Sequence, residues 1–458
     1  MAVNHDHLLL HFAANGAYTS GGKQLLVLER AEGSYVYDTD GRRYLDGLSS
    51  LFCCQIGYRY GDEMAEVAGD QLRRLPFNTN WATAHPPAIE LSSRLAGLAP
   101  EGIEAVFFTN GGSESVEAAW KIVLQYHAEN GEPERRKAIA RDRAYHGITM
   151  GALALTGVPR FREPFGEPAI STRHVSSTNP FRSELTDRQL TASLLDELQE
   201  VIDEEGPDTI AMVIAEPIQN AGGCLVPPPG YWEGLREICD RFGILLVADE
   251  VISGFGRIGE WFGGEVYGGR PDLITVAKGL TSGYAPMGAV LVHERIAEPL
   301  YQPGTTLLHG ITFGGHPLSA AIALHNIEIF EREKVLDNVR RLGPYLRRRL
   351  EEEVLPLPIV GDIRGHGFFF AAEMVKDDSN GRFESEEVAR IVREIVPRRL
   401  LEVGLIARAD DRGDPVLQVA PPLIADEAVL DELVTKMRHV LAATGEEIGM
   451  SPVVAAHA

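Results

Sequence analysis

The sequence predicts an α/β protein with a mostly parallel sheet and helices on both of its faces. Short apolar runs rich in Val, Ile, Leu and Phe alternate along the chain with segments of helical character. Within the runs, apolar residues do not alternate with polar ones, which is typical of strands buried on both sides. The chain has 458 residues, more than one hydrophobic core usually serves, so a large domain and a smaller one are expected.

The predicted elements follow from these runs. The expected strands of the large domain are 105–109, 209–217, 244–250, 273–278 and 289–293, and helices are expected between them at 113–131 and 231–243. Near the N-terminus, 36–49 resembles a hairpin because Asp40-Gly41 suits a tight turn. The alternation of strands and helices favours parallel strands.

The C-terminal third is more strongly charged and predicts a second α/β unit. Helices are expected at 331–353, 386–401 and 426–443, and a strand at 367–375. The last helix carries apolar residues at helical spacing. We therefore predict a large domain over 71–330 and a small domain built from 1–70 and 331–458.

Composition excludes several functions. A formal net charge of −23 argues against binding to nucleic acid or to an anionic membrane surface. No stretch reaches the length of a membrane span, and the N-terminus lacks a basic signal-like region. The cysteines have no metal-type spacing and are expected to be reduced thiols of a cytoplasmic protein without a metal site; they are Cys53, Cys54, Cys224 and Cys239.

The stretch TNGGSESVEAA (109–119) places glycines between a strand and a helix. Backbone N–H groups of Gly112 and Ser113, with the Ser113 hydroxyl, are suited to an anion at the helix N-terminus. The pattern is neither a dinucleotide-binding nor a nucleoside-triphosphate motif. A tight turn with Ser113 as N-cap is the alternative.

Charged residues end two buried runs further along the chain. Asp249 and Glu250 end ILLVADE, and Lys278 ends LITVAK directly before Gly279. Carboxyl ends of parallel strands are where α/β folds bind ligands. From these fragments alone, a capping role for Asp249 and a solvated amine for Lys278 remain open.

Together, the three positions predict one site at one edge of the sheet. A loop for phosphate, an acid to protonate a pyridine nitrogen and a lysine to form a Schiff base are what pyridoxal 5′-phosphate (PLP) requires. Lys278 and Asp249 are therefore the predicted catalytic residues.

The stretch from LLVADEVISGFGRIG to TVAKGLTSGYAPMGAV resembles the signature of the class III aminotransferases. Further landmarks occur in family order: FFTNGGSESVEAA, AYHGITMGALALTG, AEPIQNAGG, HGITFGGHPLSAA and VAPPL. The resemblance covers nearly the whole chain and implies the fold type I architecture of PLP-dependent transferases, with PLP bound covalently to Lys278.

The resemblance also implies further cofactor contacts. Gly112 and Ser113 hold the phosphate, joined by Thr312 from the neighbouring subunit of a homodimer or dimer of dimers. The other residues implied to contact the cofactor are Tyr145 on the ring, His146 beside it, Val251 on the opposite face, Gln219 near the ring hydroxyl, and Glu216.

The substrate residues are implied by the amine:pyruvate branch of the family. Arg408 lies where that branch carries a carboxylate-binding arginine, although a longer loop before VAPPL leaves Arg412 as an alternative and a surface role open. Phe12, Phe52 and Trp81 resemble aromatic walls, with Trp81 from the partner subunit. Phe52 stands where that branch often has tryptophan, which leaves the amine donor open.

The implied activity is transfer of an amino group from a primary amine or ω-amino acid to an oxo acid, pyruvate, by a ping-pong mechanism. ITFGGHP, with His316, resembles the pyruvate users more than the 2-oxoglutarate users. An aminomutase of the same fold, an aminotransferase using 2-oxoglutarate, and a cofactor-binding regulator are the alternatives. The regulator is disfavoured because no DNA-binding segment is appended.

Overall fold

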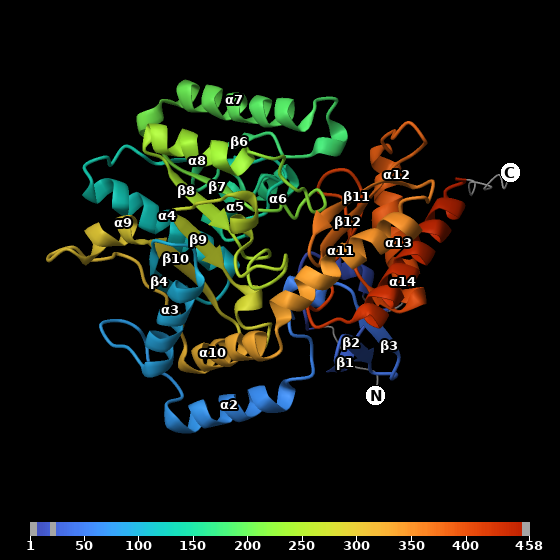
Figure 1. Cartoon of the computed structure of the whole chain (residues 1–458), viewed down its shortest axis with the longest axis horizontal. Coiled ribbons are helices and arrows are strands. Elements are labelled where there is room, and N and C mark those ends of the chain that lie inside the picture. Colours follow the sequence, from blue (N-terminus) through green and yellow to red (C-terminus); the bar gives the residue numbers. More distant parts are fainter. Residues whose placement is uncertain (1–6, 19–23, 451–458) are drawn as a thin grey trace.

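The computed structural model describes residues 7–18 and 24–450 and confirms the α/β class (Figure 1). Over these residues, the strands form one seven-stranded sheet and two four-stranded sheets. The seven-stranded sheet has the order β4-β10-β9-β8-β7-β5-β6. Its strands are β4 (Ile103–Thr109), β5 (Lys137–Arg141), β6 (Ser171–Val175), β7 (Ile210–Ala215), β8 (Leu245–Asp249), β9 (Leu273–Val276) and β10 (Gly288–His293).

Strand direction in this sheet decides where the strand ends meet. β5 to β9 pair in parallel, whereas β10 runs antiparallel to both β9 and β4. β4 therefore has the same direction as β8 and β9, and the carboxyl ends of all three lie at one edge. All five predicted strands are confirmed, and β5 and β6 were missed because their polar residues hide the apolar pattern.

Side chains of one strand serve two cores in alternation. Along β8, Leu246 and Ala248 belong to the apolar cluster that includes helices α3, α7 and α8, whereas Leu245 and Val247 belong to the cluster with α4 and α5. Burial on both faces explains the unbroken apolar run. These helices are α3 (Pro86–Leu98), α4 (Gly112–Glu129), α5 (Met150–Leu155), α7 (Asp187–Glu205) and α8 (Tyr231–Phe242).

The N-terminal and C-terminal segments share a sheet, of order β1-β2-β3-β13, in which β3 pairs in parallel with β13. The predicted hairpin is confirmed as β2 and β3, and Gly41 has the positive φ, 81°. The second small sheet has the order β11-β12-β15-β14. The bounds are β1 (Leu28–Glu32), β2 (Tyr35–Asp38), β3 (Arg43–Asp46), β11 (Val360–His366), β12 (Phe369–Met374), β13 (Leu405–Ile406), β14 (Arg408–Asp410) and β15 (Val416–Val419).

Two predicted C-terminal helices are interrupted in the structure. The helix expected over 331–353 begins only at Val335, because Lys334 is left-handed with φ 53° and separates α11 from α10. The helix expected over 386–401 contains a π-helical segment, η8 (Ile391–Ile395). Pro397 has no N–H for the carbonyl four residues earlier, which disfavours a regular α-helix there.

The remaining helices are α1 (Ser49–Phe52), α2 (Gly61–Arg74), α6 (Pro159–Arg162), α9 (Glu294–Ala297), α10 (Pro317–Arg332), α11 (Val335–Glu353), α12 (Ser385–Arg390), α13 (Val396–Val403) and α14 (Glu427–Glu447). Short 3₁₀ turns are η1 (Asn15–Tyr18), η2 (Glu163–Phe165), η3 (Pro180–Arg182), η4 (Pro207–Thr209), η5 (Gly263–Tyr267), η6 (Lys278–Leu280) and η7 (Glu298–Tyr301).

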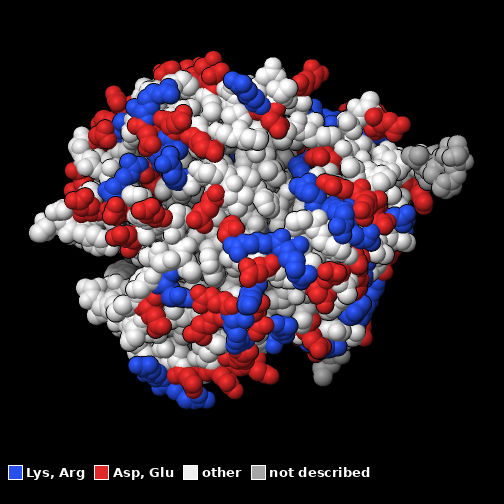
Figure 2. Space-filling model, viewed as in Figure 1, with Lys and Arg blue, Asp and Glu red and all other residues white. Residues whose placement is uncertain are grey.

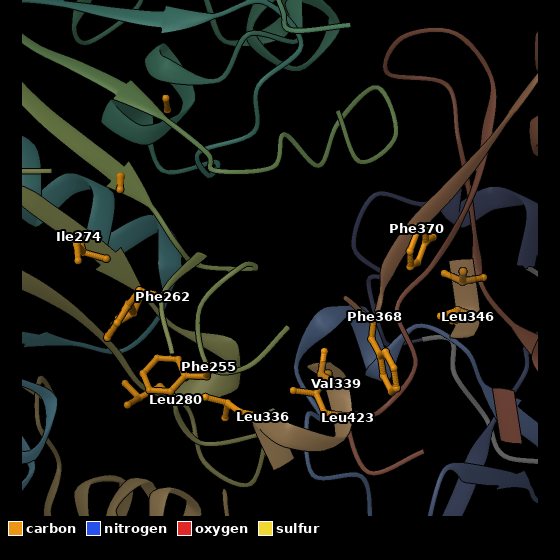
Figure 3. Packing of buried hydrophobic residues seen from close by; sticks show 14 of the residues in the cluster. Phe255, Phe262, Ile274, Leu280, Leu336, Val339, Leu346, Phe368, Phe370 and Leu423 are labelled. Atoms are coloured by element: carbon orange, nitrogen blue, oxygen red, sulfur yellow. The ribbon is translucent and has the colours of Figure 1, made fainter. Parts of the chain in front are cut away.

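Apolar packing is continuous between the large sheet and the C-terminal elements. Figure 3 shows Phe255 and Leu280 on the side of the large sheet, Leu336 on α11, and Phe368 and Phe370 beyond it; all belong to one buried cluster. The division at residues 71 and 330 stays a prediction. In the structure these positions fall inside α2 and α10.

The charged surface is mixed. On the face that Figure 2 shows, viewed as in Figure 1, acidic and basic side chains are interspersed. This agrees with the many ion pairs of the described residues. None of the helices within residues 7–18 and 24–450 is long and apolar enough to cross a membrane.

The turn between β11 and β12 generates a test of this packing. Gly367 has φ 58°, and a Cβ there would lie 2.5 Å from the Ile258 Cα. We expect Gly367→Ala to destabilise the protein by more than about 2 kcal/mol, from backbone strain together with overpacking. Gly131→Ala is the matched control, because Gly131 has φ 80° but open space around it, so only a backbone cost of about 1 kcal/mol is expected. Thermal unfolding of both variants provides the measurement, and equal shifts would contradict the packing argument.

Candidate active site

The carboxyl ends of β4, β8 and β9 surround a cavity of about 150 Å³. Asp249 ends β8, Lys278 follows β9, and α4 begins at Gly112 after β4. The structure thus brings the three predicted positions together. The cavity is lined by Gly112, Ser113, Tyr145, His146, Gly147, Glu216, Ile218, Asp249, Val251, Ile252, Ser253 and Lys278.

The N-terminus of α4 provides donors at one end of the cavity. Gly111, and not Ser113, is the N-cap of this helix, so the sequence-based alternative of a Ser113 cap is wrong. The first N–H groups of an α-helix have no partner inside the helix and attract anions. The Ser113 hydroxyl accepts a hydrogen bond from the Ile148 N–H at 3.2 Å, which leaves its own proton available to a ligand.

Gly112 permits close contact with the opposite wall. A Cβ at this position would lie 2.9 Å from Cγ1 of Val251. Gly147 is similarly constrained, with φ 128° and the Ser113 Oγ 2.5 Å from a Cβ placed there. A side chain at either glycine would overlap another residue of the cavity wall, Val251 or Ser113.

Asp249 is a buried carboxylate, 4% exposed, with a hydrogen-bonding partner on each oxygen. His146 Nδ1 lies 2.7 Å from Oδ2, and the Thr275 hydroxyl donates to Oδ1 at 3.2 Å. The Val251 N–H also donates to Oδ1, at 3.1 Å. These contacts fix the orientation of the carboxylate. The neighbouring Glu250 instead accepts from the Gly263 and Gly264 N–H groups and has a structural role.

Lys278 places an amine in the same cavity. Burial lowers the pKa of its ammonium group, an effect that Cys53, Asp249 and Glu216 oppose electrostatically. A lower pKa increases the fraction of neutral amine, the nucleophilic form. The backbone φ of Lys278 is 42°, a left-handed conformation that is uncommon for lysine and often marks a functional position.

Glu216 and Gln219 lie in the loop after β7. Glu216 is buried and accepts from the N–H groups of Tyr145 and Asn220; burial raises its pKa. The Gln219 side chain donates to the Asp142 carbonyl at 2.9 Å. Its Oε1 is buried and has no hydrogen-bonding partner among the described residues, but Gln219, unlike Glu216, does not line the Lys278 cavity.

Aromatic residues surround the approach to the cavity. Tyr145 lines the cavity and contacts Phe161 edge-on at 6.4 Å, and Phe161 in turn lies 5.2 Å from Phe12. Phe52 is 1% exposed, and its ring centre lies 6.0 Å from the Lys278 Nζ. Phe12 is 68% exposed, so in this chain it forms the outer edge of the aromatic group.

Phe52 reaches this position through an unusual turn. Ser49, Ser50, Leu51 and Phe52 all have positive φ, between 45° and 70°. Asp46 holds the turn by accepting from the N–H groups of Leu48 and Ser50, and the buried guanidinium of Arg257 donates to Ser49 Oγ at 3.1 Å. Sequence analysis missed both supporting residues.

Trp81 and Thr312 lie away from Lys278 within this chain. Trp81 lines a separate hollow of about 880 Å³ together with 307–311. Thr312 is exposed. Neither residue lines the Lys278 cavity.

The two candidate arginines differ in their partners. Arg412 is buried, and its guanidinium lies against both carboxylate oxygens of Asp410, with Nε at 2.9 Å from each. The Arg408 guanidinium makes no hydrogen bond to a described residue and has a long ion pair with Asp410, in which Nε lies 3.7 Å from Oδ2. Burial, together with the charge of Arg412, lowers the pKa of Arg408 to about 10.

The fold and the cavity define a class of protein. A helix N-terminus with a serine, an oriented buried carboxylate and a buried lysine amine fit the phosphate, the pyridine nitrogen and the aldehyde of PLP. The cavity wall also carries His146 Nε2, a buried nitrogen without a hydrogen-bonding partner among the described residues, and two glycines, Gly112 and Gly147. These features are those of a fold type I PLP-dependent enzyme.

Comparison with known families identifies the particular one. The family model "Aminotransferase class-III" matches residues 17–441, and the chain belongs to this PLP-dependent family. A probable aminotransferase of Mycobacterium tuberculosis is 50% identical over 96% of this chain and 94% of its own. A putrescine–pyruvate aminotransferase of Pseudomonas aeruginosa is 39% identical over 98% and 96%. A diaminobutyrate–2-oxoglutarate transaminase of Halomonas elongata is 35% identical over 95% and 92%.

Solved structures agree. An (S)-enantioselective omega-transaminase from Thermomicrobium roseum has a TM-score of 0.89 and 40% identity, covering 96% of both chains. An omega-transaminase from Pseudomonas jessenii, solved with PMP, has a TM-score of 0.90 and 34% identity, covering 97% of this chain and 98% of its own. The chain is therefore an aminotransferase, and PLP is its cofactor.

The close approach of Gly112 and Val251 predicts a binding defect. We expect Gly112→Ala to weaken PLP binding about tenfold, because the added methyl overlaps Val251 at the helix N-terminus. Equilibrium titration of the apoenzyme with PLP measures the effect. Gly111→Ala is the control, since a Cβ there meets nothing within 4 Å. Equal affinities for the two variants would refute the assignment of this wall to the cofactor.

Proposed function

We propose that this aminotransferase moves the amino group of a primary amine or ω-amino acid to pyruvate by a ping-pong mechanism. The observation that carries the proposal is a guanidinium without a hydrogen bond beside a cavity that holds an amine: Lys278 lies beside Asp249, and the Arg408 guanidinium makes no hydrogen bond to a described residue.

Different residues of the cavity bind different parts of PLP in this proposal. The N-terminus of α4, with Gly112 and Ser113, binds the phosphate, and Asp249 pairs with the pyridine nitrogen. His146 orients the Asp249 carboxylate through its 2.7 Å contact. The other cofactor contacts that we propose are Tyr145 and Val251 on the ring faces, Gln219 near the ring hydroxyl, and Glu216, which positions the Tyr145 backbone.

Bound PLP supplies an aldehyde that condenses with amines and a ring that delocalises the electrons of a breaking C–H bond. The chain contributes the proton transfers. In the first half-reaction, Lys278 Nζ removes the proton from the carbon that bears the amine. In the second, it delivers a proton to the corresponding carbon of the oxo acid. The lowered pKa of Lys278 favours the neutral form of its amine, and the Asp249 carboxylate stabilises positive charge at the ring nitrogen.

Arg408 is the group that we assign to the substrate carboxylate. A guanidinium binds a carboxylate through two parallel hydrogen bonds. Among the described residues the Arg408 guanidinium has only a 3.7 Å ion pair with Asp410, whereas Arg412 donates hydrogen bonds to both oxygens of Asp410. Tyr145, Phe52 and Phe12 provide apolar contact for the remainder of the amine. A donor without a carboxylate uses these walls and does not need Arg408.

Pyruvate is favoured over 2-oxoglutarate as acceptor. The relative named putrescine–pyruvate aminotransferase is 39% identical, against 35% for the relative that uses 2-oxoglutarate. ITFGGHP also resembles the pyruvate users. Arg408 is the one arginine that we assign to a substrate carboxylate. The site therefore suits an acceptor with a single carboxylate.

A second copy of the chain completes the site in this proposal. Thr312 and Trp81 are exposed and lie away from the Lys278 cavity, on segments that also expose Leu308 and Phe313. In a homodimer or dimer of dimers, Thr312 of the partner subunit reaches the phosphate and the partner's Trp81 adds an aromatic wall.

The test of the proposal is spectroscopic. Holoenzyme mixed with putrescine alone is expected to lose the visible absorbance of lysine-bound PLP and then to stop, because the amino group stays on the cofactor. Addition of pyruvate is expected to restore the absorbance and to yield alanine. Lys278→Ala is expected to lower turnover more than about 1,000-fold.

Each contrary outcome has a distinct meaning. Recovery with 2-oxoglutarate but not with pyruvate would overturn the acceptor. Continuous conversion of one amino compound without an oxo acid would instead support the aminomutase alternative. Turnover of Lys278→Ala at the wild-type rate would overturn the mechanism.

Arg408 generates a separate prediction. We expect Arg408→Ala to raise the KM for pyruvate about tenfold or more, because the bidentate contact is lost, and to leave the half-reaction with 1-phenylethylamine within about twofold. Arg341→Ala is the control, since Arg341 is exposed and pairs only with α11 and α14 side chains. The same loss in Arg412→Ala, and not in Arg408→Ala, would move the role to Arg412.

A further inference from the structure

The loop that follows Arg408 forms ion pairs with different parts of the molecule, among them α6 and η8. β14 and β15 form a hairpin in which Arg408 pairs with Gln418 and Asp410 with Val416. The connecting loop, 411–415, has the sequence DRGDP. The loop therefore directly follows the strand that carries Arg408.

Two aspartates attach this loop to its surroundings. Asp414 pairs with Arg143, Arg182 and Arg382, and Asp411, three residues after Arg408, pairs with two further arginines. The Asp411 carboxylate forms a hydrogen-bonded ion pair with Arg160 of α6 and another with Arg393 of η8, whose Nη2 lies 2.9 Å from Oδ2. The Asp411 side chain is 13% exposed, so these pairs are partly shielded from water. Burial alone would raise the pKa of Asp411, but the two arginines outweigh this effect and lower the pKa to about 2. The side chain is therefore ionised near neutral pH.

The two arginines come from different parts of the fold. Arg160 precedes Phe161, which contacts both Tyr145 and Phe12. α6 therefore connects the aromatic group of the site with Asp411. Arg393 lies in the π-helical segment of the C-terminal helices, and π-helical turns often occur at functional positions.

Arg408 depends on this arrangement because little else holds it. Arg412, which carries a like charge, contributes to lowering the pKa of Arg408, and its guanidinium lies 5.6 Å from the centre of the Tyr145 ring. Asp410 is hydrogen-bonded to Arg412 and lies 3.7 Å from Arg408. A loop free to move would carry Asp410 and Arg412 with it and would change the field around Arg408.

We propose that Asp411 is a positioning residue that, by binding Arg160 and Arg393 together, holds Arg408 in place for substrates with a carboxylate. This inference rests on the role of Arg408 in the proposed function. It makes Asp411, a residue that touches neither cofactor nor substrate, a determinant of the balance between carboxylate-bearing and apolar substrates.

The experiment compares half-reactions of the holoenzyme. For Asp411→Asn, we expect the apparent dissociation constants of L-alanine and pyruvate to rise about tenfold, while 1-phenylethylamine reacts within about twofold of wild type. Stopped-flow absorbance of bound PLP measures all three. Arg393→Gln is expected to show the same split, and because Arg393 is 63% exposed, its replacement does not threaten folding.

Two controls separate positioning from general damage. Asp337→Asn removes an exposed ion pair with Arg340 on α11 and is expected to behave as wild type. Asp411→Glu retains the charge and is expected to recover most of the affinity for L-alanine. Equal losses for L-alanine and 1-phenylethylamine in Asp411→Asn would overturn the inference, since a structural defect does not discriminate between them.

Failure of the inference and failure of the proposed function give different patterns. If Arg408→Ala loses affinity for pyruvate but Asp411→Asn and Arg393→Gln do not, the positioning role is wrong and the role of Arg408 stands. If Arg408→Ala binds pyruvate as wild type does, the carboxylate role of Arg408 is wrong, and the inference fails with it.

Discussion

The site depends on one electrostatic constraint, the burial of a carboxylate and an amine in the same small cavity. An unpaired buried charge costs several kcal/mol, so the fold must satisfy Asp249 without neutralising it. It does so with an imidazole, a hydroxyl and a backbone N–H, each of which leaves the carboxylate available to a cationic ring. Among the described residues, the Lys278 amine has no such set of hydrogen-bonding partners. Burial lowers its pKa instead.

Backbone strain is concentrated around these charges. Lys278 and the four residues Ser49–Phe52 all have positive φ, a conformation that costs non-glycine residues about 1–2 kcal/mol each. The cost is borne by supporting groups in the core: Asp46 bonds the turn's N–H groups, and Arg257 binds Ser49 and the carbonyls of Phe368 and Pro421. The C-terminal elements thus contribute to the conformation of the turn that places Phe52 near Lys278.

Strand ends could be predicted from the sequence because strands that are buried on both faces have unbroken apolar sequences. Asp249 and Lys278 each end such a run, and the shared direction of β4, β8 and β9 then brings them together. β5 and β6 escaped because KAIAR and STRHV carry polar residues. The π-helical segment left a local trace in Pro397, whereas the left-handed turn at Ser49–Phe52 left none, since no glycine occurs there.

Residue type alone also could not distinguish the arginines near the site, because their capacity to bind a ligand depends on what the fold has already given them. Arg257 is committed to two carbonyls and a hydroxyl, and Arg412 to both oxygens of Asp410. Arg408 is two residues from Asp410, yet its guanidinium makes no hydrogen bond to a described residue. Since a guanidinium with satisfied donors gains little from a further carboxylate, the uncommitted one is the group that substrate recognition can use. Two neighbouring aspartates thus affect which arginine remains available to substrate: Asp410, the last residue of β14, is bound to Arg412, and Asp411 ties the following loop to its neighbours.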